Sequence, residues 1–289
     1  MGATPKLNRV DRRATPPSVA SRAGRVRVAA ARPLLSPAGR IVALAVAAAC
    51  VAVTALLGAR FAHQTQAGWL DAAVDGRVQA SLGSHPQLLH TLERLGRPKS
   101  IAAMTAALAL ACLVWRWYRG ALLTLSVPAA GVITEFGLKP LFGRLDSGSL
   151  SFPSGHATGM FALAAAVTVL LFARPGGGRA ARALRLLLSL AAFLVAAAVA
   201  IAMVGLGVHY FTDAVGGAAV GTGTVLATAL ALDLTGSGWR RRRERRPVPP
   251  PHREEQAADP SALPGQAGLR RATTNTRRNG STVPYGAGG

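Results

Sequence analysis

The chain has 289 residues, of which 50% are apolar and only 16% are charged, and its formal net charge is +21. The apolar residues fall into long blocks without an amphipathic period, which excludes an ordinary soluble protein. Because the basic residues gather at the two ends of the chain and in short loops between the blocks, the positive charge indicates membrane topology before it indicates a nucleic-acid partner.

The first third of the chain contains one spanning block and one mixed segment. Residues 1–40 are rich in Arg, Pro, Ala and Ser, and we expect them to be disordered. The block 41–62 is longer than the core of a signal peptide, so it predicts a retained anchor helix. Within the mixed segment 63–99, four leucines share one helical face, which is typical of a short helix on the membrane surface. These are Leu88, Leu89, Leu92 and Leu95.

Five further blocks each approach the roughly 20 residues that a helix needs to cross the hydrocarbon of a bilayer. They are 100–117, 120–138, 157–173, 186–206 and 211–233. From Trp239 onward the chain is basic and then rich in Pro and Gly. The pattern predicts an all-α integral membrane bundle of about six transmembrane helices over 41–235, with disordered basic tails at 1–40 and 236–289.

The basic residues also predict the orientation of the spans. With the N-terminus in the cytoplasm, six spans place four regions on that side, and these contain 9, 2, 4 and 6 Lys or Arg, 21 together. The regions are 1–40, 115–119, 174–185 and 240–246. The opposite side contains only six Lys or Arg. We therefore expect a multi-pass protein of the cell membrane with both termini in the cytoplasm.

Three polar clusters stand at span ends that face the same, extracytoplasmic side. The third span ends in the run 139–144, Lys-Pro-Leu-Phe-Gly-Arg. The fourth begins with 152–156, Phe-Pro-Ser-Gly-His, and the loop before the sixth carries 209–213, His-Tyr-Phe-Thr-Asp. These clusters supply two histidines, a carboxylate, two cations and a glycine at a helix start, which predicts one anion-sized pocket.

Several of these residues are suited to binding phosphate. Backbone N–H groups at a helix start, here near Ser154, Gly155 and His156, form an anion site, and a glycine lets the backbone approach closely. Lys139 and Arg144 can neutralise charge on the phosphate oxygens. Two simpler interpretations remain open, because Ser154 is also a good helix cap and a lysine at a span end is also a membrane anchor.

The histidines are suited to phosphoryl transfer. A histidine and an aspartate at i and i+4 can share one helical face, so Asp213 can orient His209 and leave its other nitrogen free to attack phosphorus. His156 can then protonate the departing oxygen. This chemistry needs no metal and no cofactor, and the sequence contains no carboxylate cluster that would hold a metal ion.

The pattern Lys-x4-Arg, Pro-Ser-Gly-His and His-x3-Asp, each at a helix end, resembles the type 2 phosphatidic acid phosphatase superfamily, which also includes the distant vanadium haloperoxidases. The resemblance covers roughly residues 65–235. It implies that His209 is the nucleophile of a phosphohistidine mechanism, that Asp213 orients it, and that His156 is the general acid. It also implies that Lys139, Ser154 and Gly155 bind phosphate.

The chain departs from the family pattern at two arginine positions. The first family motif continues as Lys-x6-Arg-Pro, but Asp146 and Ser147 stand in those places. The third motif has an arginine six residues before its histidine, where this chain has Met203. Arg144 matches an arginine that is often found two residues before the missing one. Asp146 is also interpreted as a turn residue beside Ser147 and Gly148.

Three arginines of the outer segment are candidates to replace the missing cations in space. They are Arg77, Arg94 and Arg97. Each lost charge-assisted contact could cost a few kcal/mol of transition-state stabilisation, so the replacement matters for turnover.

The leading hypothesis is a phosphatase that acts at the outer membrane face on a phosphorylated lipid, such as phosphatidic acid, phosphatidylglycerophosphate or an undecaprenyl-type pyrophosphate. The alternative is a non-catalytic relative that binds or moves such a lipid or scaffolds a membrane complex, which the two missing arginines favour. A third hypothesis, a polyanion-binding membrane anchor acting through the basic tails, leaves the three polar clusters without a role. In the first two cases the partners are the bilayer and a lipid, and not nucleic acid.

Overall fold

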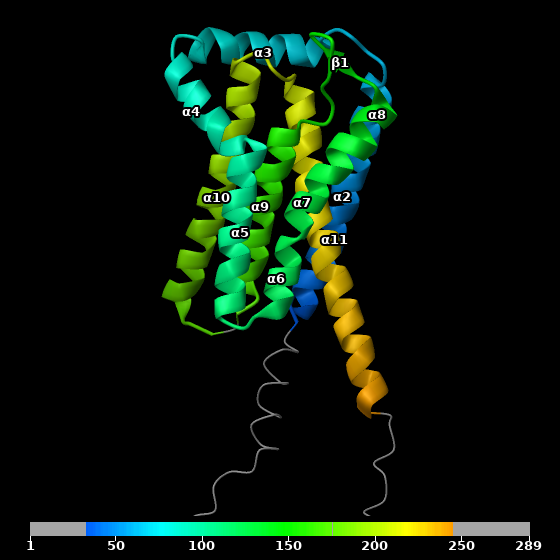
Figure 1. The fold of residues 1–289 in the computed structure, drawn as a ribbon, viewed down its shortest axis with the longest axis vertical. Coiled ribbons are helices and arrows are strands. Elements are labelled where there is room, and N and C mark those ends of the chain that lie inside the picture. Colours follow the sequence, from blue (N-terminus) through cyan, green and yellow to red (C-terminus); the bar gives the residue numbers. More distant parts are fainter. Residues whose placement is uncertain (1–32, 175, 245–289) are drawn as a thin grey trace, which may run out of the picture. The chain divides into compact units, whose positions relative to one another are not determined.

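The computed structural model of the chain describes residues 33–174 and 176–244, with side chains through residue 235. Apart from one short hairpin, the described elements are helices. In chain order, with the labels of Figure 1, they are α2 (Pro37–Phe61), α3 (Trp69–Leu82), α4 (Pro86–Gly96), α5 (Pro98–Val114), α6 (Tyr118–Thr124), α7 (Ser126–Val132), the π-helical η1 (Ile133–Leu138), α8 (Lys139–Phe142), β1 (Leu145–Asp146), β2 (Ser149–Leu150), α9 (Gly155–Phe172), α10 (Arg179–Gly205) and α11 (Phe211–Glu244).

Among the described residues, five helical stretches are long and apolar enough to cross a membrane, and there are six if the bent pair α4 and α5 counts as one span. The five are α2, the interrupted helix Tyr118–Phe142, α9, α10 and α11. Large apolar side chains such as Ile41 and Phe136 are 73% and 80% exposed, as expected where hydrocarbon takes the place of water. The predicted all-α membrane bundle of about six transmembrane helices is confirmed.

Prolines explain where two of the spans are broken. Pro98 begins α5 directly after α4, and the two helix axes differ by 52°. In the third span, Pro128 cannot donate to the carbonyl of Thr124, and α6 gives way to α7 there. Further on, the N–H of Lys139 bonds the carbonyl of Thr134 five residues back, which makes η1 a π-helical turn. The interruption therefore lies next to the predicted lysine.

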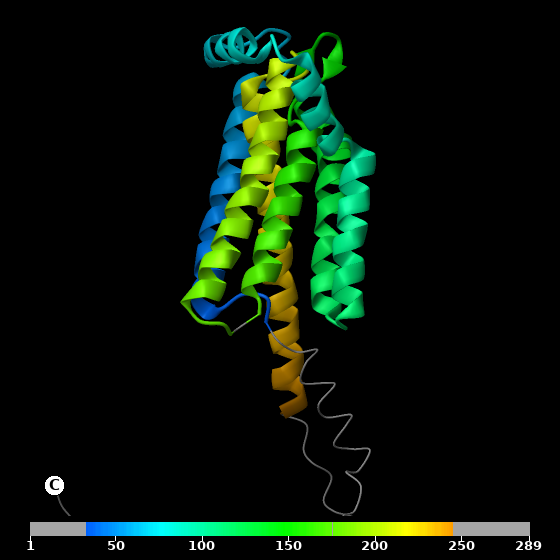
Figure 2. The ribbon, with the colours of Figure 1, turned by 90° about the vertical axis from the view of Figure 1, so that its left-hand side faces the viewer.

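The predicted surface helix is present as α4, which begins at Pro86. Leu89 is 2% exposed and Leu92 packs on the core, whereas Leu88 and Leu95 remain exposed. Its position at the membrane surface stays a prediction. The second helix of the same segment, α3, lies across one end of the bundle in both views (Figures 1 and 2). We call this the α3 end.

The centre of the bundle is α9, which packs against α5, α7, α10 and α11 (Figure 2). Its closest neighbour is α11, because two glycines of α11 face its backbone. A Cβ at Gly217 would collide with the carbonyl oxygen of Ser154, and one at Gly221 with that of Thr158. Small residues let membrane helices approach in this way. The contact fixes the start of α9 beside the start of α11.

At the opposite end of the bundle, Asp233 of α11 joins three segments. Its carboxylate is fully buried and accepts the backbone N–H groups of Leu34 and Leu35 at 2.8 and 3.0 Å. It also pairs with Arg119 at 2.8 Å and Arg40 at 3.3 Å. We call this the Asp233 end.

The predicted tails 1–40 and 236–289 fall almost wholly outside the described residues. Within the described part, α2 begins at Pro37 behind the cap Ser36, whose Oγ accepts the N–H of Gly39 at 3.0 Å. At the other boundary, α11 continues to Glu244. The division of the chain into two tails and one membrane domain stays a prediction.

Candidate functional site

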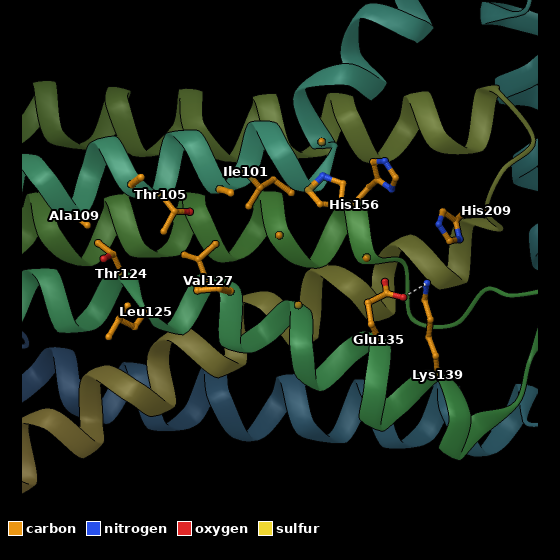
Figure 3. A pocket seen from close by; sticks show the side chains of 18 residues that line it. Ile101, Thr105, Ala109, Thr124, Leu125, Val127, Glu135, Lys139, His156 and His209 are labelled. Atoms are coloured by element: carbon orange, nitrogen blue, oxygen red, sulfur yellow. Dashed lines mark ion pairs between the residues drawn. The ribbon is translucent and has the colours of Figure 1, made fainter.

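The ends of three spans bring two histidines and one lysine to a single cavity at the α3 end. Lys139 begins α8, His156 lies in the first turn of α9, and His209 lies in the turn between α10 and α11. The centroids of the two imidazole rings are 6.4 Å apart. All three side chains line a cavity of about 550 Å³ (Figure 3). The three predicted polar clusters therefore converge in space.

His209 faces Asp213 across a gap slightly longer than a hydrogen bond. Nδ1 of His209 lies 3.7 Å from Oδ2 of Asp213 and has no hydrogen-bond partner among the described residues. The two residues were expected to share a helical face, but α11 begins at Phe211, so His209 lies in the turn before it. Catalytic contacts of this kind are often long in a site without substrate and shorten on binding.

Asp213 is held rigidly on its other sides. Its carboxylate is fully buried, with Oδ1 accepting from Nη1 of Arg144 at 2.7 Å and Oδ2 from the N–H of Tyr210 at 3.2 Å. Its own carbonyl oxygen accepts the N–H of Ser154 at 3.0 Å. The carboxylate that faces His209 is thus connected to the hairpin segment and to the start of α9.

Arg144 is a buried connector and does not reach the cavity. It is fully buried, and its Nη2 donates to Oδ2 of Asp71 at 2.6 Å while Nη1 contacts Asp213. The guanidinium lies between the rings of Phe61 and Tyr210, at 4.4 Å from each centroid. Both terminal nitrogens are bound to carboxylates and the side chain lies outside the cavity lining, so the contact of Arg144 with phosphate stays a prediction.

Two aspartates of α3 cap the first turn of α11. Oδ1 of Asp71 accepts the N–H of Thr212 at 2.9 Å, and Oδ1 of Asp75 accepts the N–H of Phe211 at 3.1 Å. These N–H groups have no partner within the helix, so a carboxylate from a neighbouring helix satisfies them. Burial raises the pKa of Asp75 to about 6; the Phe211 N–H opposes this shift, and the nearby carboxylates of Asp71 and Asp213 add to it.

Ser154 is a helix cap in this structure. Its Oγ accepts the N–H of Ala157 at 3.4 Å, its side chain is fully buried, and its N–H is bonded to Asp213. Ser154 lies outside the cavity lining and acts as the cap of α9, whereas its predicted contact with phosphate stays a prediction. Gly155, the next residue, does line the cavity.

Lys139 is paired with an acidic residue that sequence analysis did not single out. Its Nζ lies 2.9 Å from Oε2 of Glu135, one turn earlier in η1 (Figure 3). The other oxygen of Glu135 lies so close to Gly155 that a Cβ there would collide with it. Lys139 thus meets a carboxylate at the position where a phosphate was expected.

The bend between α4 and α5 brings a second acid near His156. Oε1 of Glu93 lies 4.0 Å from Nε2 of His156, and that nitrogen has no hydrogen-bond partner among the described residues. Gly96 permits the approach, since a Cβ there would lie 3.1 Å from the ring of His156 and 2.6 Å from Val199.

Away from the histidines, the cavity is an apolar slot between α5 on one side and α6 and α7 on the other (Figure 3). Its wall on α5 runs from Pro98 to Ala109, about 16 Å of helix at 1.5 Å per residue. The residues of both walls are Pro98, Ile101, Ala102, Thr105, Ala106, Ala109, Thr124, Leu125, Val127, Pro128 and Gly131. The cavity is therefore polar at the α3 end and apolar along its length.

The two residues that replace family arginines lie away from the cavity lining. Asp146 pairs with Ser149 in the β1–β2 hairpin, and its Oδ1 accepts from Oγ of Ser147 at 3.2 Å, as the turn interpretation predicts. Met203 is 1% exposed and packs inside the bundle.

The three outer arginines also lie outside the cavity lining. Arg97 pairs with Glu93 at 2.8 Å, and neither Arg77 nor Arg94 lines the cavity. Among the described residues, Lys139 is the only Lys or Arg of the lining. In the same part of the chain, no three His, Cys, Asp or Glu residues form a group that could hold a metal ion.

Sequence reasoning missed three acidic residues of this region. Asp71 and Asp75 carry a usable signal, since two acids at i and i+4 are unusual in a chain with only 12 acids. Glu135 carries another, because it is the only charged residue of the predicted span 120–138.

The comparisons with known proteins agree with this arrangement. A family model described as the PAP2 superfamily matches residues 129–235, the part that carries Lys139, His156 and His209. The fold is similar to that of a transmembrane PAP2-type phosphatidylglycerolphosphate phosphatase from Bacillus subtilis, with a TM-score of 0.50 and 18% identity over 69% of this chain and 98% of that one. No curated protein matches the chain. The part of the chain that carries the three motifs therefore matches the PAP2 superfamily model, and the fold is that of a transmembrane PAP2-type protein.

Proposed function

We propose that the protein is a membrane phosphatase that removes phosphate from a lipid through a phosphohistidine on His209. The observation that carries the proposal is a single cavity that joins two histidines and a lysine to an apolar slot about 16 Å long. A phosphorylated lipid has the same division into an anionic head and a hydrocarbon chain. The match of residues 129–235 to the PAP2 superfamily model and the fold shared with the similar phosphatase support the reaction class.

In the proposed reaction, Asp213 holds Nδ1 of His209 and leaves Nε2 to attack phosphorus. The bond between phosphorus and the lipid oxygen breaks as His156 protonates that oxygen. Water then attacks the phosphohistidine and gives its proton back to His156, which releases phosphate and restores His209. Lys139 and the backbone at Gly155 bind the phosphate oxygens.

We further propose that the α3 end faces the extracytoplasmic side. The count of basic residues in the sequence supports this orientation, with 21 in the four segments predicted to be cytoplasmic and six in the segments predicted to lie on the opposite side. The substrate lipid then lies in the outer leaflet, with its chain between α5 and α7.

The test is release of inorganic phosphate by the purified protein in detergent, over a panel that includes phosphatidic acid, phosphatidylglycerophosphate and undecaprenyl pyrophosphate. The wild-type protein should release phosphate from at least one lipid and should form an acid-labile phosphoprotein. The His209→Ala protein should do neither. Equal release by both proteins would end the phosphohistidine mechanism.

A second candidate function is favoured by one observation. Only Lys139 remains as a cation at the cavity among the described residues, and it is already paired with Glu135. This supports a relative that binds a phosphorylated lipid without hydrolysing it. In that case the same lipids bind to the wild-type protein, but phosphate release stays at the level of the His209→Ala protein.

A further inference from the structure

Glu135 is an acidic residue inside the span Tyr118–Phe142, and it faces the cavity. Ionisable residues at such positions are costly and are usually retained for a function. The π-helical turn that carries Glu135 is itself a feature that is frequent at functional sites. These features indicate that Glu135 does more than form an ordinary ion pair with Lys139.

The carboxylate of Glu135 lies where an anion would bind. One oxygen is 2.9 Å from Nζ of Lys139, and the other lies against the Cα of Gly155, at the start of α9. A lysine and a helix start are the two features that attract a phosphate group. In the free protein, both of them face Glu135.

The charges around this position cancel. Among the described residues that line the cavity, Lys139 is the only Lys or Arg and Glu135 the only acid, and His156 and His209 are the other titratable groups. The nearest charges outside the lining are already paired, Glu93 with Arg97 and Arg144 with two aspartates. The attraction of Lys139, which alone would favour a dianion over a monoanion, is therefore offset by Glu135, and the larger cost of removing a dianion from water is left without compensation.

We propose that Glu135 is a specificity-determining residue that restricts the site to phosphate groups with a single negative charge. Such groups are phosphodiesters and phosphomonoesters that retain one proton. A phosphate dianion binds well only when the Glu135 carboxylate leaves Lys139. As a statement about which substrates are hydrolysed, this inference rests on the proposed function. As a statement about which anions bind, it can be tested without catalysis.

The test compares two small anions at pH 8, where inorganic phosphate is mainly a dianion and dimethyl phosphate is a monoanion. Binding to the protein in detergent is measured by calorimetry for the wild-type, Glu135→Gln and Glu135→Asp proteins. The matched control is Asp146→Asn, which removes one negative charge in the hairpin, outside the cavity lining.

The Glu135→Gln protein should bind inorganic phosphate roughly tenfold more tightly than the wild-type protein, because a repulsive charge is removed. The repulsive energy is proportional to the charge of the ligand, so the monoanion dimethyl phosphate should gain only half as much binding energy. Its affinity should therefore increase by about the square root of the factor expected for inorganic phosphate. The Glu135→Asp protein keeps the charge and should keep the wild-type order of the two anions. The Asp146→Asn protein should behave like the wild type.

The inference is overturned if Glu135→Gln leaves phosphate affinity unchanged or weakens it, as expected if Glu135 only holds Lys139 in place. It is also overturned if neither the wild-type nor the Glu135→Gln protein binds phosphate at any concentration. Failure of the proposed function has a different signature, namely no phosphate release from any lipid while Glu135→Gln still gains affinity for the dianion.

Discussion

At the scale of single residues, the most informative side chain is Arg144. Its charge is balanced by Asp71 and Asp213, and the rings of Phe61 and Tyr210 cover both of its faces. Arginine suits this position because its planar fork can bind two carboxylates while its faces stack on aromatic rings. The residue therefore contributes to the site by fixing Asp213, which in turn faces His209.

The Arg144→Leu protein should lose stability even without substrate, because two buried carboxylates would lose their partner. Breaking a buried pair of this kind costs about 3–5 kcal/mol of unfolding free energy. The measurement is the thermal unfolding midpoint in detergent. The Arg97→Gln protein, which breaks the exposed pair with Glu93, serves as the control and should unfold near the wild-type temperature.

A stable Arg144→Leu protein with weakened binding of inorganic phosphate would contradict this interpretation. That result would return Arg144 to the direct phosphate contact expected from its place in the motif. The sequence could not decide between the two, because Asp71 lies 73 positions away in the chain and does not belong to any of the three motifs.

At the scale of elements, α3 determines how α11 begins. The carboxylates of Asp71 and Asp75, one turn apart on α3, accept the first free N–H groups of α11. The helix that carries Asp213 is thus capped by a separate helix and not by its own preceding residue. A displacement of α3 would therefore change the distance between Asp213 and His209.

The cap also predicts a pH dependence of stability. Since burial raises the pKa of Asp75 to about 6, the folded protein holds a proton there more tightly than the unfolded chain does. The contribution of this group to stability is therefore present below about pH 4 and is lost as the pH rises to about 6. The Asp75→Asn protein keeps a side-chain oxygen that can accept the N–H of Phe211. Because an asparagine side chain does not titrate, this protein does not lose stability as the pH rises to about 6.

Thermal unfolding of the two proteins between pH 4 and pH 8 checks this prediction. The stability of Asp75→Asn relative to the wild type should increase from pH 4 to about pH 6 and then stay constant. A constant difference across the whole range would show that Asp75 does not titrate in this window.

The sequence predicts some of the helices and their positions, but not all of them. Among the described residues, the five spans, and a sixth if α4 and α5 count as one, were predictable because a helix that crosses a membrane needs about 20 apolar residues and polar residues stand at the ends of each block. The convergence of Lys139, His156 and His209 followed from the alternation of span ends. The position of α3 across the bundle and the bend before Pro98 depend on packing between distant segments, so the sequence could single out Asp75 as unusual but could not place it beside α11, and it could not place Glu93 beside His156.

At the scale of the membrane-spanning bundle, its two ends carry different features. The α3 end carries the cavity, and the Asp233 end joins the start of α2 to α6 and α11. The excess of basic residues on the Asp233 side supports its proposed position in the cytoplasm.

Cysteine labelling tests that orientation. With Cys50 and Cys112 replaced by alanine, single cysteines are introduced at Ser84, an exposed residue of the α3 end, and at Gly178, an exposed residue of the opposite end. In intact cells, a membrane-impermeant maleimide should label Ser84→Cys at once and Gly178→Cys only after lysis. Labelling in the reverse order would contradict the proposed orientation and would place the cavity at the cytoplasmic leaflet.

The pairing at Asp233 has a consequence for the order of biogenesis. Leu34 and Leu35, just before α2, donate their N–H groups to a residue that lies 199 and 198 positions later in the chain. Arg119 likewise finds its carboxylate only in the last helix. A nascent chain that has inserted every described span except α11 therefore lacks the carboxylate that joins α2 and α6, and this end of the bundle closes only after Asp233 has been synthesised.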